Sequence, residues 1–147
     1  MEIMSKYFQL KEFVASNTAK QMGIDNTPSF EVVDHLQELV STILDPLRKD
    51  WGSPIKVTSG YRCPALNKAV GGSSNSSHKI GYAADIQPAN GELDKFINFC
   101  KSWFKSHKDI LSWDQVILEK SVYTQWVHIG LKDCRGRQRK QIFNMVV

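Results

Sequence analysis

The sequence predicts an α+β fold in which flanking helices pack against a small, mostly antiparallel sheet. Two stretches, residues 29–47 and 92–105, carry apolar residues at helical spacing. Four shorter stretches have the alternating or apolar pattern of strands: residues 54–59, 83–87, 113–119 and 125–131. The short connection between the last two strands can close an antiparallel hairpin.

The first third of the chain is expected to build the helical side of the core. Residues 7–14 mix aromatic and charged side chains and predict a short anchoring segment on the surface of the core. Residues 16–20 fit a helix start or a loop, and residues 23–28 are rich in turn formers. Thr27 or Ser29 can cap the helix over 29–47, and Pro46 is expected to disturb or end it.

The middle of the chain alternates strands with turns. Gly60 and Pro64 stop the strand over 54–59, and residues 64–70 fit a short helix. Residues 71–75 predict a flexible loop that leads to His78, and residues 88–91 break the strand that follows it. After the hairpin, the chain is basic over residues 132–140 and then apolar again at residues 142–143. We interpret residues 134–140 as a solvated tail, with a contact to nucleic acid or wall polymers as the alternative.

Length and composition set broad limits on what the protein is. A chain of 147 residues fits a single domain, 1–147, with a basic tail from about residue 132. The net charge of +4 is modest and does not choose between nucleic acid, acidic lipid and wall polymers as partners. No apolar run approaches the roughly 20 residues of a membrane span, so we expect no membrane insertion.

Cysteine usage and the first residues bear on where the protein works. Cys63, Cys100 and Cys134 form no close pair, which indicates reduced thiols and excludes a cysteine zinc site. The N-terminus lacks the pattern of a secretory signal. We therefore expect synthesis in the cytoplasm, and action on an extracellular substrate only after release.

Three chemistry-bearing residues stand out. Residues 76–85 read S-x-H-x-x-G-x-A-x-D and contain His78 and Asp85, and residues 126–128 read W-V-H and end in His128. Two imidazole nitrogens and one carboxylate oxygen are a common ligand set for catalytic zinc, with the fourth position left to water. A single histidine in an apolar strand is more often structural, so the spacing alone leaves both a metal site and a structural role open.

The surrounding residues add a family resemblance. Ser59-Gly60-Tyr61-Arg62, the 76–85 motif and Trp126-Val127-His128 together resemble the zinc D-Ala-D-Ala peptidase family, over about residues 7–131. That family shares its fold with D-Ala-D-Ala carboxypeptidases and dipeptidases, phage L-alanyl-D-glutamate endolysins and the Hedgehog signalling domain. The N-terminal segment and the 44–48 helix end are most similar to its short phage and bacterial branch.

The resemblance implies a zinc ion, Zn²⁺, held by His78, Asp85 and His128. It also implies that Arg62 faces the substrate, where its guanidinium can bind a terminal carboxylate or an oxyanion. The alternative for Arg62 is a surface salt bridge. Ser76 is a candidate to orient His78, and Trp126 can line a substrate cleft or belong to the core.

The general base is the point at which the chain departs from the family. Relatives often carry Glu or Asp three residues before the last histidine ligand, where this chain has Gln125, which takes up no proton at neutral pH. We choose Glu119 instead, since a hairpin that brings it opposite Trp126 places it on the same face as His128. The alternative for Glu119 is a solvated carboxylate at the end of its strand.

The resemblance implies a zinc metallopeptidase that cleaves peptidoglycan stem peptides, either as a carboxypeptidase at D-Ala-D-Ala or as an endopeptidase. A phage or prophage endolysin that degrades the cell wall is the first form of this hypothesis, and a bacterial wall-remodelling enzyme is the second. The alternative from another class is a zinc-stabilised, non-catalytic module that binds the wall or belongs to a phage particle, which the glutamine at position 125 keeps open. We expect a monomer whose partner is the stem peptide and which has no nucleic-acid partner.

Overall fold

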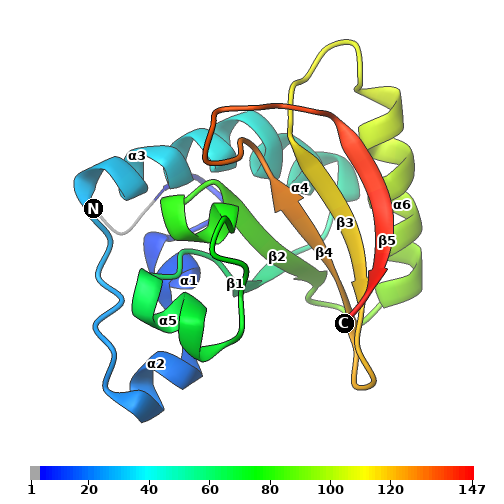
Figure 1. Cartoon of the computed structure of the whole chain (residues 1–147). Coiled ribbons are helices and arrows are strands. Elements are labelled where there is room, and N and C mark those ends of the chain that lie inside the picture. Colours follow the sequence, from blue (N-terminus) through cyan, green and yellow to red (C-terminus); the bar gives the residue numbers. More distant parts are fainter. Residues whose placement is uncertain (1–3) are drawn as a thin grey trace.

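A five-stranded sheet with helices around it forms the fold of residues 4–147, the part of the chain that the computed structural model describes (Figure 1). The strands are β1 (Ile55–Ser59), β2 (Ala83–Pro88), β3 (Gln115–Lys120), β4 (Gln125–Gly130) and β5 (Gln141–Val146). The α-helices are α1 (Leu10–Val14), α2 (Asn17–Met22), α3 (Phe30–Leu39), α4 (Asp45–Trp51), α5 (Pro64–Ala69) and α6 (Leu93–Ser106). Two further short helices are the π-helical η1 (Val40–Leu44) and the 3₁₀-helical η2 (Ser77–Ile80).

The strand order is β1-β2-β4-β3-β5. All neighbours are antiparallel except β3 and β5, which run parallel. The predicted α+β class with a mostly antiparallel sheet is therefore confirmed. The predicted hairpin is present as well, with Glu119 paired to Trp126 and Lys120 paired to Gln125.

The central strands give the sheet two different faces because successive side chains alternate. One face is apolar and fully or nearly buried, and it packs into the core with α6 and the α3–α4 segment: Ala84, Ile86, Val116, Leu118, Val127 and Ile129. The opposite face carries Ile117 together with the polar and aromatic side chains of the candidate site: Asp85, Glu119, Trp126 and His128. The sheet thus separates the core from the candidate site.

The predicted helix over 29–47 forms, and Pro46 disturbs it, as one of the two predicted outcomes, without ending it. Ser29 caps α3 by accepting a hydrogen bond from the Val32 N–H, as one of the two predicted caps. The helix then widens into η1 and continues as α4 to Trp51. Proline has no N–H to donate, and its ring crowds the carbonyl of the preceding turn, so a wide turn before Pro46 lets the helix continue.

The N-terminal segment is more deeply buried than the sequence indicated. We expected residues 7–14 on the surface of the core, but Phe8 and Phe13 are 1% and 0% exposed and belong to it. Residues 16–20 do begin a helix, since Ser16 caps α2 through the Ala19 N–H. The mix of aromatic and charged residues in this stretch therefore reflects a short helix with a buried face.

The last residues form a strand that the sequence analysis did not predict, whereas most of residues 134–140 are exposed, as expected of a solvated stretch. Residues 141–146 form β5 against β3, and Ile142 packs against the core. Arg139 holds this strand in place, because its guanidinium donates to both oxygens of the buried Asp114 at 2.7 and 2.8 Å. A buried carboxylate needs such a partner, and the arginines of the basic stretch supply it.

Replacing Arg139 by alanine is predicted to destabilise the protein by about 2 kcal/mol, because Asp114 is then left buried without its charged partner. Urea denaturation followed by tryptophan fluorescence measures the change. Lys101→Ala, on the exposed side of α6, is the matched control and should leave the free energy of unfolding within about 0.5 kcal/mol. Equal stability of the two variants would contradict the role assigned to Arg139.

Candidate metal centre and cleft

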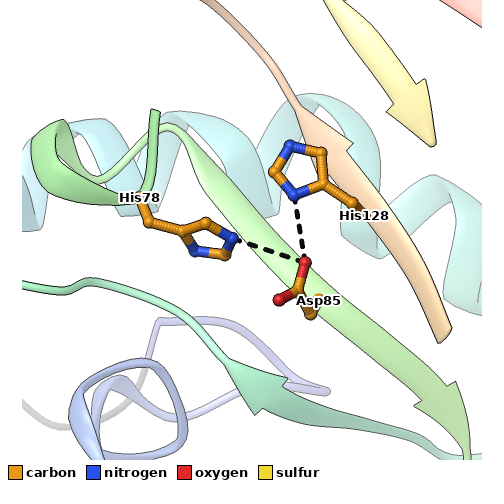
Figure 2. Close-up of side chains that lie close together, drawn as sticks. All are labelled: His78, Asp85 and His128. Carbon is orange, nitrogen blue, oxygen red and sulfur yellow. Dashed lines mark hydrogen bonds and ion pairs between the residues drawn. The ribbon is translucent and has the colours of Figure 1, made fainter. Parts of the chain in front are cut away.

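Three side chains from separate elements converge on one point. They are His78 on η2, Asp85 on β2 and His128 on β4 (Figure 2). Asp85 Oδ1 lies 3.0 Å from His128 Nδ1 and 3.4 Å from His78 Nε2. One potential ligand atom from each residue lies within 4.8 Å of the others. The three residues are therefore positioned to bind a metal ion.

Strand register accounts for two of the three. Asp85 and His128 are directly paired across the antiparallel β2–β4 ladder, so their side chains leave the sheet on the same face. The third reaches them from a short 3₁₀-helix that Ser76 caps by accepting a hydrogen bond from the His78 N–H. Gly81 ends that helix at a φ of 81°, a conformation that favours glycine, and turns the chain into β2.

His78 is prepared for ligation through Nε2. Its Nδ1 lies 2.7 Å from the carbonyl oxygen of Gly60, which fixes Nδ1 as the protonated nitrogen and leaves the Nε2 lone pair toward Asp85. Its side chain is 2% exposed, and this burial lowers the pKa of His78 despite the neighbouring carboxylate. A neutral imidazole is the form that binds a metal ion.

Gly60 supports the position of His78, a role that the sequence analysis did not predict. A Cβ at this position would lie 2.4 Å from the backbone oxygen of Phe13, so only glycine allows the close approach of α1. The same peptide unit presents the carbonyl that orients His78. Its signal in the sequence is the Ser59-Gly60-Tyr61-Arg62 motif.

Asp85 and His128 favour a positive charge between them. Burial alone would raise the pKa of Asp85, but the two imidazoles outweigh it and hold that pKa well below its usual range. Burial alone would lower the pKa of His128, but its hydrogen bond to Asp85 and the nearby carboxylate charges raise it overall. A divalent cation meets the same electrostatic demand and displaces the proton from the ring, so the donor set fits a metal.

The three residues lie in a cleft of about 810 Å³ that Arg62, Glu119 and Trp126 also line. The Arg62 guanidinium reaches Ser76 Oγ at 3.5 Å, and its Nε is buried without a hydrogen-bond partner in the described structure. Burial lowers the pKa of Arg62. It therefore stands beside the metal centre rather than in a surface salt bridge.

Glu119 faces the same cleft. The hairpin register puts Glu119 opposite Trp126 and on the same face as His128, as the sequence analysis required. Trp126 Nε1 donates to Glu119 Oε2 at 2.5 Å, and burial together with the charge of Asp85 raises the pKa of Glu119 overall. Gln125 lies one residue from Trp126 in β4, so its side chain is on the face of Val127, away from the cleft.

The family model described as Peptidase M15 matches residues 6–129, which include all three converging side chains. The chain belongs to the Peptidase M15 family. A search of curated protein sequences found no match. Membership of Peptidase M15 indicates a metallopeptidase, and the zinc dependence of that family agrees with the donor set of this site.

The sequence analysis did not predict that residues after β4 would line this cleft. The stretch 133–139, which follows β4, forms one wall of this cleft through Asp133, Cys134, Arg135, Arg137 and Arg139. Its signal in the sequence is an aspartate followed by a glycine between two arginines, which we had interpreted as part of a solvated tail. The ion pair between Arg139 and Asp114, which fixes this stretch to the sheet, joins residues far apart in the sequence.

The centre predicts stoichiometric zinc binding that depends on His128. Substituting His128 by alanine should weaken zinc binding by more than about 100-fold, because loss of even an orienting neighbour costs 10- to 100-fold. Isothermal titration calorimetry of the purified protein measures the affinity. His107→Ala, on a histidine that stacks on Trp103 near the end of α6, should bind zinc as the unmodified protein does. Equal loss in both variants would contradict this site.

Proposed function

We propose that this protein is a zinc-dependent peptidase that hydrolyses peptidoglycan stem peptides, either as a D-Ala-D-Ala carboxypeptidase or as a murein endopeptidase. The observation that carries the proposal is the convergence of His78, Asp85 and His128 in an open cleft that Glu119 and Arg62 share. Family membership supports the class of reaction. The stem peptide as substrate follows from the resemblance of the motifs to D-Ala-D-Ala peptidases.

A zinc ion held by the three ligands would supply Lewis acidity for the scissile carbonyl and lower the pKa of a water molecule. The protein must supply the proton transfers. Glu119 accepts a proton from the attacking water and returns it to the nitrogen of the leaving amine. A raised pKa suits the first step, because a more basic carboxylate takes up the proton of the water more readily.

Arg62 supplies positive charge on the substrate side of the cleft. Its guanidinium lines the cleft, and the partly buried setting strengthens its interaction with an anion. The developing oxyanion and a terminal carboxylate of the substrate are both suitable partners. Either role gives tighter binding of the transition state or of the substrate.

We also propose where the protein acts. The substrate lies outside the cytoplasm, and a phage or prophage lysis enzyme that reaches the wall after release fits the resemblance to short phage members. The proposed active unit is a monomer, since one chain supplies the whole site. No helix in residues 4–147 is both long enough and apolar enough to cross a bilayer.

The alternative is a zinc-stabilised module without turnover, which the glutamine at position 125 favours. The position of Glu119 answers that objection. It is a half-buried carboxylate in the cleft whose pKa is raised, and it lies on the ligand face, whereas Gln125 lies on the other. The enzyme is therefore the better conclusion.

Replacing Glu119 by glutamine is predicted to lower the rate of wall digestion by about 10²- to 10⁴-fold while zinc binding is retained. Turbidity loss of purified cell walls, with mass analysis of the released fragments, measures the activity. Glu31→Gln, at a glutamate that is 82% exposed on α3, is the control and should digest walls normally. Undiminished digestion by the Glu119 variant would favour a different base.

The pH profile tests the same carboxylate independently. The acid limb of kcat/KM should lie at higher pH than for an ordinary glutamate, because burial and the charge of Asp85 raise the pKa of Glu119. The Trp126 N–H stabilises the ionised carboxylate, so Trp126→Phe removes a contribution that lowers the pKa. The acid limb should therefore move to higher pH in this variant. A limb that stays in place would show that another group controls it.

A further inference from the structure

The far wall of the cleft carries a cluster of arginines. Figure 1 shows the segment between β4 and β5, orange to red, crossing the end of the sheet. Arg135, Arg137 and Arg139 from this segment line the same cleft as the metal centre. The family match ends at residue 129, so this wall lies outside the part of the chain that the family model describes.

The wall is held in one conformation before any ligand binds. The buried Asp133 carboxylate accepts hydrogen bonds from the backbone N–H groups of Arg135 and Arg137, at 3.0 and 2.7 Å. Gly136 turns the chain between them at a φ of 75°. Arg139 is fixed on Asp114 by two hydrogen bonds. A preorganised loop loses little conformational entropy when it binds.

Two of the arginines keep donors for a ligand. Arg137 is 51% exposed and directs Nε to Asp133, which leaves its terminal nitrogens for another partner. Arg135 is exposed, and its guanidinium makes no ion pair within residues 4–147. Arginine binds planar carboxylates through two parallel hydrogen bonds. Both side chains therefore offer donors to an anionic group that enters the cleft.

The floor between the metal centre and this wall follows the strands. It passes from His128 on β4 and its partner Ile117 on β3 to Gln115, which is next to the Asp114 that holds Arg139. Two residues along a strand amount to roughly 7 Å, the length of about two extended residues. A peptide lying along the floor thus reaches beyond its scissile bond.

We propose that Arg135 and Arg137 form a subsite that binds a carboxylate of the peptide substrate away from the scissile bond. This inference rests on the proposed peptidase function and adds a specificity determinant to it. A single carboxylate fits better than a polyanion, because Asp85, Asp114, Glu119 and Asp133 line the same cleft and repel an extended chain of negative charges. Stem peptides carry such carboxylates, and in their amidated forms these groups are neutral.

The test uses two synthetic stem peptides that differ only in one carboxylate, free in the first and amidated in the second. The zinc-loaded full chain should cleave the acidic peptide about three- to tenfold more efficiently, mainly through a lower KM. Arg135→Gln should bring the ratio of the two kcat/KM values close to one. Arg135→Lys should restore part of it, since lysine keeps the charge but loses the paired donors.

Lys101→Gln removes the same charge from the exposed side of α6 and should keep the full preference. An equal preference in the unmodified protein and in Arg135→Gln would overturn the subsite, and so would a preference that disappears in Lys101→Gln as well. If neither peptide is cleaved, the proposed function fails, and calorimetric binding of the two peptides then decides the subsite by the same ratio. Tighter binding of polyphosphate than of the acidic peptide would overturn it in favour of a polyanion site.

Discussion

One carboxylate between two imidazoles organises this protein. Asp85 Oδ1 contacts both His78 and His128, and all three side chains are largely removed from water. Burying one such charge alone would be costly, so each of the three groups depends on the others. The pKa of Asp85 falls because the rings are present, and the pKa of His128 rises because Asp85 is present. The arrangement favours a cation at its centre.

The sheet makes this arrangement possible through its register. Asp85 is paired with His128, and its neighbours Ala84 and Ile86 are paired with Ile129 and Val127 on the core face. A slip of one residue between β2 and β4 would turn the carboxylate into the apolar core, so packing and chemistry specify the same pairing. The core face resists the slip, because all four of its residues are fully buried.

The sequence was sufficient for those parts of the fold and site that depend on local pattern. Periodicity predicted the long helices and the hairpin, and strand alternation placed Glu119 on the face of His128. The family motifs pointed to the three converging residues. The continuation of the helix past Pro46 was not predictable, because it depends on a π-helical turn for which the local sequence carries no signal. The strand β5 was missed because Asp114 and Arg139, which fix it, lie far apart in the sequence.

The C-terminal segment extends the cleft beyond the region that the family model matches. Its ion pairs on Asp114 and Asp133 stabilise the fold, and the same arginines line the cleft. A stretch that composition alone assigns to a solvated tail therefore lines the cleft. The metal centre indicates the class of chemistry, whereas this wall carries the proposed subsite for a substrate carboxylate.

Anomalous diffraction from crystals grown with zinc, recorded on both sides of the zinc absorption edge, tests the central claim most directly. The account predicts one strong peak bonded to His78 Nε2, Asp85 and His128 Nδ1, at about 2.0–2.2 Å from each ligand atom. A peak bound elsewhere, or no peak between these three side chains, would contradict it.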